Sequence, residues 1–309
     1  MAKDYPHTMT YCGEWKNETG MLDFSMRNDY LFRVLLQADE ATLKAIIAAF
    51  LGIGVAEIKN VEVVNPIIPG ESISEKEFHL DVRTITTVEQ VRGINFEMQN
   101  HRHSGWNERC VSYLARTFDS LVHGEDYEDA KPVWQIMICN FVLFEGCNEF
   151  RSDFSLRNEK NLNQIFTDKL RITHINLQCA DNATGDDINS GLLKWARLFK
   201  CESWEELKML AEKDTQIDEA ASSVWQLTAD ELIRERIRSR EEGEHIWAVH
   251  EREVEEAKRN AAKEVEEAKR QAKREADKEA RIKESMQKQL DEKDKIIAEL
   301  LKKLENKGV

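Results

Sequence analysis

The sequence predicts an α/β fold, a mixed β-sheet flanked by helices, followed by a helical extension and a long charged C-terminal helix. Three observations lead to this prediction. Apolar and polar residues alternate along 76–87 and 91–100, which is the period of a half-buried strand. Apolar residues recur at helical spacing before and after these segments. Beyond residue 240 the chain consists mostly of Lys, Arg, Glu and Ala and contains no Pro.

The charge of the chain limits what the body can bind. The 309 residues carry a formal net charge of −14, and residues 241–309 hold 17 basic and 19 acidic residues, which leaves about −12 on the body. Non-specific affinity for nucleic acid comes mainly from neutralised phosphates, so a body this acidic is a poor generic DNA binder. Any contact with DNA must use a local basic patch.

Cysteine usage and hydropathy indicate a cytoplasmic protein. The six cysteines form no C-x-x-C pair and none of the Cys/His spacings of structural zinc, so we expect free, buried thiols. The N-terminus lacks the apolar run of a signal peptide, and no stretch of about 18 apolar residues occurs. We therefore expect no membrane partner.

Four segments follow one another along the chain. Residues 1–20 are polar and mixed, and we expect them to be flexible. The core, residues 21–180, begins with a helix whose start lies near Ser25 or Asn28. The further expected elements of the core are a helix at 40–51, a strand at 58–64, an antiparallel hairpin at 76–87 and 91–100, a helix at 107–122, and strands at 134–144 and 169–177. Residues 181–240 form the helical extension.

The tail, residues 241–309, contains an 11-residue repeat, in which the segment from Glu253 recurs from Glu264. This period favours a straight or slightly right-handed superhelix. Beyond Met286 the apolar residues follow a heptad, with Leu290, Ile297 and Leu304 in one position and Met286 and Leu300 in the other. A dimeric coiled coil is the expectation there. The alternative is a solvated single helix held by Glu–Lys pairs.

One group of polar side chains on the predicted hairpin could hold a metal ion. Residues two apart on a strand share a face, so Glu97 and Gln99 point together, and Asp81 lies on the partner strand. If Asp81 and Glu97 lie opposite or diagonally, both carboxylates reach one cation. Hard oxygen ligands favour Mg²⁺ or Mn²⁺, and such an ion can activate water against a phosphodiester. The alternative is that these are ordinary solvent-facing polar residues.

The chain also resembles the PD-(D/E)XK nuclease family of transposases, also called recombination-promoting nucleases (Rpn), over roughly residues 21–245. The resemblance rests on short motifs at the first helix and the hairpin, on two residues of the next helix, and on features of the extension. They are Arg27-Asn28-Asp29-Tyr30-Leu31-Phe32-Arg33, Leu80-Asp81-Val82-Arg83, Asn95-Phe96-Glu97-Met98-Gln99, Arg109, Tyr113, Trp195 and Glu241-Glu242-Gly243.

This resemblance implies a restriction-endonuclease-like core and a metal-dependent DNA endonuclease linked to mobile elements or recombination. Asp81 and Glu97 would be the metal ligands, and Asp29 an auxiliary acid that orients a water molecule at the metal. Gln99 stands where the wider superfamily has Lys. An amide cannot act as a general base, and a Gln at this position looks common in this branch of the family.

Several basic and aromatic residues near the hairpin could contact DNA. Arg109 and Tyr113 follow it closely, and the alternative for Arg109 is a surface ion pair with Glu108 or another acid. Arg102, between His101 and His103, lies in a loop that would face DNA or solvent; the alternative is that the two histidines bind a metal ion. The basic run Arg234, Arg236, Arg238 and Arg240 could touch a phosphate backbone, but interleaved acids favour a solvated helix face.

Two other functions remain compatible with the sequence. The body could be a degenerate nuclease fold kept as a DNA- or protein-binding module, which the acidic charge and Gln99 favour. Alternatively, the coiled coil could be the functional part and recruit a partner protein. The chain contains no Gly-rich phosphate loop, no G-x-S-x-G elbow and no H-E-x-x-H pair. A metal-dependent DNA nuclease that dimerises through its tail is the favoured interpretation.

Overall fold

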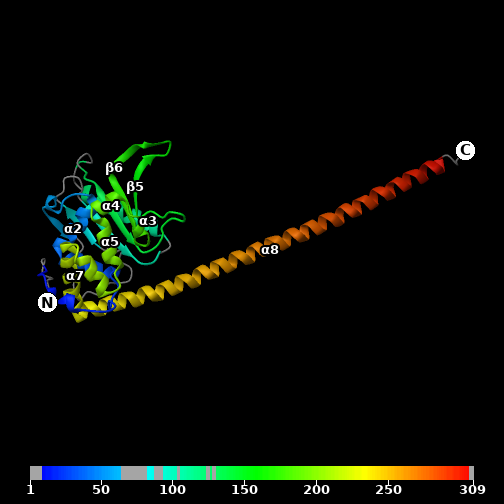
Figure 1. Ribbon diagram of the computed structural model, residues 1–309. Helices are drawn as coiled ribbons and strands as arrows, with labels where there is room; N and C mark the ends of the chain where they lie inside the picture. The colour runs from blue at the N-terminus through cyan, green and yellow to red at the C-terminus, as the bar shows by residue number, and fades with distance from the viewer. Residues whose placement is uncertain are drawn as a thin grey trace. The chain divides into compact units, whose positions relative to one another are not determined.

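The computed structural model of the protein describes residues 9–63, 82–86, 93–102, 105–122, 126 and 130–305, of which 82–86, 120–122 and 304–305 are described by their backbone alone. The element order is mixed α/β, as predicted (Figure 1). None of the helices in these ranges has the length and apolarity needed to cross a bilayer.

The first two α-helices form where the sequence predicts them. Helix α1 spans Asp29–Ala38, and the side chain of its N-cap residue Asn28 accepts a hydrogen bond from the Leu31 backbone N–H. Helix α2 spans Glu40–Leu51 and ends at Gly52, whose φ of 68° is a left-handed conformation that glycine adopts without steric cost. Asp39 between them caps α2 by accepting from the Thr42 N–H.

A six-stranded mixed sheet forms the centre of the body, in the order β1-β2-β3-β4-β6-β5. Strands β2 and β3 pair antiparallel, which confirms the predicted pairing, although residues 76–81 and 87–92 of the predicted hairpin lie outside the described residues; β3, β4 and β6 run parallel to one another. Helix α3 (Trp106–Val122) makes the crossover from β3 to β4. The strands are β1 (Val61–Val63), β2 (Val82–Thr86), β3 (Gly93–Gln99), β4 (Val133–Cys139), β5 (Arg151–Asn158) and β6 (Asn161–Asn176).

Three strand predictions were wrong in extent, and one strand was not predicted. Strand β1 begins at Val61, three residues after the predicted 58. Strand β4 ends at Cys139 rather than near 144, because the chain bends at residues 140–141; a turn at 145–146 follows, where Gly146 adopts a positive φ of 79°. Strand β6 begins at Asn161, eight residues before the predicted 169. It pairs with the unpredicted β5 to form a two-stranded ribbon whose residues 153–166 are all exposed. Figure 1 shows this ribbon extending beyond the other strands.

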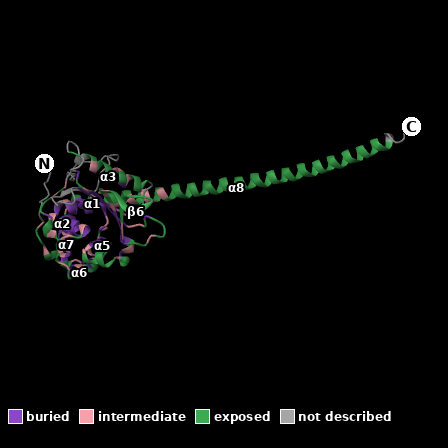
Figure 2. Cartoon of the chain, turned by 90° about the horizontal axis from the view of Figure 1, so that it is seen from above, coloured by how far each residue is buried: buried purple, intermediate pink, exposed green. Residues whose placement is uncertain are grey.

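The two faces of the sheet are covered differently. On one face Phe96 of β3 packs edge-on against Phe32 of α1 and Phe50 of α2, with ring centroids 6.5 and 5.7 Å apart. This face belongs to the main apolar core (Figure 2). The other face lies beneath α3, where smaller apolar clusters form around Trp106 and around Leu114. Glu97 belongs to this second face because it alternates with Phe96.

The segment 181–240 is helical, as expected, and packs on the core. Its helices are α4 (Gly185–Asn189), α5 (Leu192–Lys200), α6 (Trp204–Ala211), α7 (Thr215–Thr228) and the first part of α8 (Glu231–Glu305). Residues 9–20 pack on these helices instead of being flexible: Trp15 is fully buried, 6.4 Å from the Trp204 ring. Burial of this large ring outweighs the polar composition that suggested a flexible segment.

The chain divides into two compact units, residues 1–245 and 246–309. In the second unit, residues 246–305 are the rest of helix α8, and the side chains of residues 246–303 are almost all exposed. Its heptad residues Met286, Leu290, Ile297 and Leu300 are 53–65% exposed along one helix. Ion pairs four residues apart, such as Glu266–Arg270 and Glu284–Lys288, support the helix.

Candidate functional site

Strand β3 carries the acidic residue at the centre of the candidate site. Glu97 is 1% exposed and points to the face of the sheet beneath α3. A buried carboxylate is costly unless charged or hydrogen-bonding groups compensate for the lost water. The site must therefore provide positive charge or donors to Glu97.

The guanidinium of Arg109, in the first turn of α3, supplies that charge. Its Nη2 lies 3.2 Å from Oε2 of Glu97. The guanidinium carbon is 4.5 Å from the centroid of the Trp106 ring and 5.8 Å from that of Tyr113, so Arg109 stacks between two aromatic rings of its own helix. The pair joins Arg109 to Glu97 rather than to the adjacent Glu108, one of the partners considered from the sequence.

A buried polar network lies next to Glu97 on the same face. The Asn95 side-chain amide donates to Thr117 Oγ1 of α3 at 2.8 Å and to Gln135 Oε1 of β4 at 3.1 Å. All three residues are fully buried. Polar groups at such depth fix the position of α3 over the sheet, and thereby the position of Arg109 over Glu97.

Two buried cysteines also belong to this environment, and no sequence pattern predicted their position there. Burial raises the pKa of the Cys110 thiol, and the neighbouring Glu97 charge raises it further. Burial likewise raises the pKa of Cys139, with Cys110 and then Glu97 as further causes. Both residues are therefore protonated thiols at neutral pH and not nucleophiles. All six cysteines are free, as expected, but the prediction that they are buried was wrong for Cys12, Cys147 and Cys179, which are partly exposed.

The other predicted residues near β3 occupy different positions. Gln99 is the last residue of β3, half-buried, and its carbonyl accepts from the Asn140 N–H at 2.9 Å. Arg102 is exposed beyond the strand end. Tyr113 is only 4% exposed, so its ring lies against Arg109 instead of facing solvent.

Asp29 lies at the start of α1 and forms an ion pair with Arg240 of α8. Arg240 Nε donates to both carboxylate oxygens, at 2.9 and 2.7 Å. In the same region the Asn100 amide donates to the Arg27 carbonyl at 3.1 Å and to Glu244 at 3.2 Å. Burial raises the pKa of Glu244. The end of β3 is thus tied to the start of α1 and of α8.

The basic run on α8 is largely used within the protein. Arg234 pairs with Asp23 at 3.2 Å and Arg238 approaches Glu231 at 3.9 Å, in addition to the Arg240 pair. Ion pairs with acids thus occupy three of its four arginines. These contacts support the solvated, internally paired helix face over a phosphate-binding surface.

Asp81, the other predicted metal ligand, and His103 lie outside the described residues. The described β2–β3 ladder begins with Val82 opposite Phe96. Among the residues that the structure describes, no three His, Cys, Asp or Glu side chains come together as a metal-binding group.

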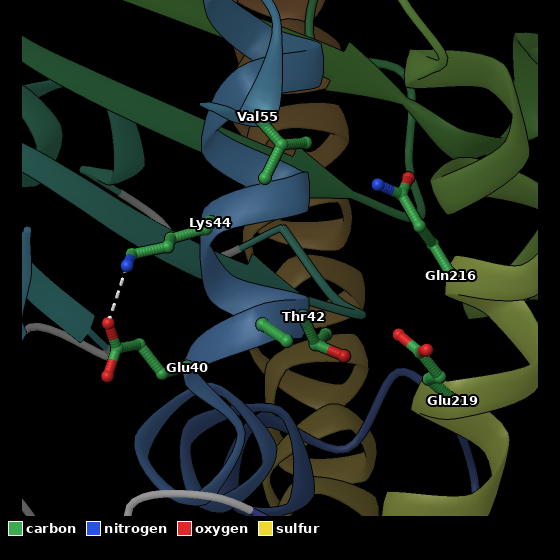
Figure 3. Close-up of a pocket in the computed structure, with 7 residues that line it drawn as sticks. Glu40, Thr42, Lys44, Val55, Gln216 and Glu219 are labelled. Carbon is green, nitrogen blue, oxygen red and sulfur yellow. Dashed lines mark ion pairs between the residues drawn. The ribbon is translucent and has the colours of Figure 1, made fainter. Parts of the chain in front are cut away.

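Two open cavities of the described surface lie away from Glu97. One of about 400 Å³ lies between α2 and α7, lined by Glu40, Thr42, Lys44, Val55 and Glu219 among others, with Glu40 and Lys44 paired at 2.7 Å (Figure 3). Another of about 470 Å³ lies beside β5. Neither includes a residue of β3 or α3.

Comparison with known families bears on this arrangement. The sequence model of a family described as PD-(D/E)XK nuclease family transposase matches residues 26–249, more than two thirds of the chain. The chain belongs to the PD-(D/E)XK nuclease family transposases. The match covers α1, the β2–β3 pair with Glu97, and α3 with Arg109. No curated protein and no solved structure gives a significant match.

Membership of the PD-(D/E)XK nuclease family transposases gives the mixed sheet and its acidic strand a chemical context. The family indicates nuclease or transposase activity, and therefore DNA as the molecule acted upon. Most of the tail, from residue 250 onwards, lies outside the matched region. The strand pattern predicted Glu97 as a candidate site residue, but it could not predict the ion pair with Arg109.

Proposed function

We propose that this protein is a metal-dependent DNA endonuclease of the cytoplasm that hydrolyses phosphodiester bonds in mobile-element transfer or recombination. One observation carries the proposal: an almost fully buried carboxylate, Glu97, lies on the strand that pairs antiparallel with the segment directly following Asp81. We propose Asp81 and Glu97 as the metal ligands. The restriction-endonuclease-like core of the family is the fold that would hold them.

The donor chemistry of the described residues fits a hard divalent cation. Glu97 offers carboxylate oxygen and Gln99 an amide oxygen two residues further on the same strand face. The Arg109 guanidinium, 3.2 Å from Glu97, already places positive charge at this carboxylate. PD-(D/E)XK nucleases generally use divalent metals, and Mg²⁺ or Mn²⁺ suits these oxygen donors.

Each residue would contribute in a different way. A bound divalent cation supplies charge neutralisation of the phosphodiester and activation of water. Glu97 holds negative charge at a fixed position on a rigid strand, which would keep the geometry of the metal ligands constant. Gln99 can orient a water molecule through its amide but cannot take its proton. Arg109 can donate to a phosphate oxygen, and Arg102 lies on the exposed loop after β3.

Asp29 has a more distant role in this proposal. Its carboxylate is held by Arg240, so it would act on a water molecule only together with that guanidinium. Tyr113 would hold Arg109 in place rather than contact DNA itself. We further propose that the protein is a homodimer that pairs through the heptad of its tail and makes two cuts.

The test is incubation of the full-length protein with supercoiled plasmid in Mg²⁺, Mn²⁺, Ca²⁺ or EDTA. We expect nicked and linear products with Mg²⁺ or Mn²⁺ and none with EDTA. Asp81→Ala and Glu97→Ala should each abolish cleavage and keep the native circular dichroism spectrum. Full cleavage by both variants would discard the assignment. DNA binding without cleavage under every metal condition would instead identify a degenerate, binding-only module.

A further inference from the structure

The Glu97–Arg109 ion pair has an unusual construction for a structural salt bridge. Its two ends differ in exposure, with the Glu97 side chain 2% and the Arg109 side chain 33% exposed. A single guanidinium nitrogen makes the contact, at 3.2 Å, instead of the two parallel hydrogen bonds of the strongest Arg–carboxylate pairs. Arg109 thus reaches from solvent to a buried carboxylate and holds it by one bond.

The aromatic rings that hold Arg109 do not depend on this bond. Trp106 and Tyr113 lie three residues before and four residues after Arg109 on α3, on the same helix face. Stacking on a ring restrains the plane of a guanidinium but allows it to slide along the ring. Among the described residues, the buried Nε of Arg109 has no hydrogen-bond partner. The guanidinium therefore has hydrogen-bonding capacity left for a different position.

A divalent cation and Arg109 would compete for Glu97. Both groups are positive. A cation bound to the Glu97 carboxylate therefore repels the Arg109 guanidinium, which lies about 3 Å from that carboxylate, and weakens the attraction between Arg109 and Glu97. A phosphate group beside the site offers Arg109 a new anionic partner with better, bidentate geometry. Substrate thus compensates for the contact that metal binding breaks.

We propose that Arg109 is an exchangeable counter-ion: it neutralises Glu97 in the protein without metal and transfers to a DNA phosphate when cation and substrate bind. The inference rests on the proposed function. Its consequence is that metal and DNA bind cooperatively, each strengthening the other by the same factor. Without substrate, Arg109 weakens metal binding, so an assembled metal site forms mainly on DNA.

The test measures binding and not activity. Mn²⁺ is titrated by calorimetry into the full-length protein, alone and with a phosphorothioate duplex that resists hydrolysis. Wild type should bind Mn²⁺ about tenfold more tightly with the duplex than without it. Arg109→Gln should bind Mn²⁺ alone about tenfold more tightly than wild type, and the duplex should add no further affinity. Arg116→Gln, an exposed arginine two turns along α3, should behave as wild type.

The direction of the change separates exchange from a purely structural role. A disturbed site would bind Mn²⁺ more weakly, whereas loss of a competing cation strengthens binding. The inference is overturned if, without DNA, Arg109→Gln binds Mn²⁺ as tightly as wild type or more weakly. It is also overturned if the Mn²⁺ affinity of the wild type is the same with and without the duplex. Arg109→Lys, which keeps the charge but loses the planar stack, should remain close to wild type without DNA and serves if the glutamine variant does not fold.

Failure of the proposed function gives a different result. A wild-type protein that binds no Mn²⁺, with or without the duplex, contradicts the metal site itself. A protein that binds Mn²⁺ equally in both conditions retains the metal site and rejects only the exchange of Arg109.

Discussion

Arg240 of α8 holds the carboxylate of Asp29 at the start of α1, with its Nε 2.9 and 2.7 Å from the two oxygens and its Nη2 2.5 Å from one of them. The two residues are 211 positions apart in the chain. Together with the Asn100–Glu244 hydrogen bond, this pair fixes the start of α8 beside the strand that carries Glu97.

Removing the arginine from this pair should destabilise the body. Arg240→Gln leaves the Asp29 side chain, 10% exposed, without its main counter-charge. Because Arg240 itself is 52% exposed, we expect a loss of only about 1–3 kcal/mol in the free energy of unfolding. Urea unfolding at neutral pH measures it. The control is Arg238→Gln, which removes the exposed ion pair between Arg238 and Glu231 at 3.9 Å. It should change the free energy of unfolding by less than about 0.5 kcal/mol.

Replacing Glu97 by its isosteric amide should separate chemistry from stability. Glu97→Gln should lower Mn²⁺-dependent plasmid cleavage by on the order of 100-fold or more, because a proposed metal ligand loses its charge. Arg109 is one-third exposed and can reach water, so the free energy of unfolding should change by only about 1 kcal/mol. Glu108→Gln, an exposed acid of α3, should leave both quantities unchanged. Cleavage at the wild-type rate would remove Glu97 from the site.

His174 of β6 should make stability depend on pH. Burial lowers its pKa to about 4, below the value of about 6.5 expected in the unfolded chain. The unfolded state thus binds the proton more strongly, so this contribution is fully present above about pH 6.5 and is lost as pH falls toward 4. From pH 7 to 4, wild type should lose on the order of 3 kcal/mol more than His174→Gln in urea titrations. Parallel pH curves would contradict this.

The heptad of the tail should set the oligomeric state. Leu290 and Ile297, both more than 50% exposed in the single chain, would lie at the seam of a coiled coil. Changing both to Asn should convert a dimer to a monomer in light scattering, since two buried amides replace apolar contacts. Lys288→Asn with Lys295→Asn, on the opposite side of the heptad, should leave the mass unchanged. A monomeric wild type would support the solvated single helix.

Sequence patterns predicted those helices and strands that have one face buried in the core and the other face exposed to water. Alternation along β3 placed Phe96 in the core and Glu97 on the other face, and the N-cap at Asn28 located α1. Alternation could not predict β5, because both faces of the β5–β6 ribbon beyond the sheet are exposed and carry mixed residues. A strand without a buried face has no hydrophobic period to detect.

Only the part of the candidate site that lies on strand β3 could be predicted from the sequence. Glu97 and Gln99 lie on the same face because they are two residues apart on a pleated strand, and this can be predicted from the sequence alone. The Glu97–Arg109 contact depends on the rotation and height of α3 over the sheet, which the buried Asn95–Thr117 hydrogen bond helps to fix. That information lies in packing between distant segments and not in local periodicity. Asp29 illustrates the same limit, since its partner Arg240 lies in a different segment.

The β5–β6 ribbon gives this protein a part whose length can vary independently of its core. Strand β6 pairs with β4 only from Leu170 to Asn176, so residues 161–169 pair with no other described strand on that side. Deletions or insertions at its tip would leave the central ladder and the Glu97 strand untouched. A fluorophore attached through Phe166→Cys, at a side chain that is 85% exposed, would therefore report on approaching macromolecules while the candidate site keeps its native geometry.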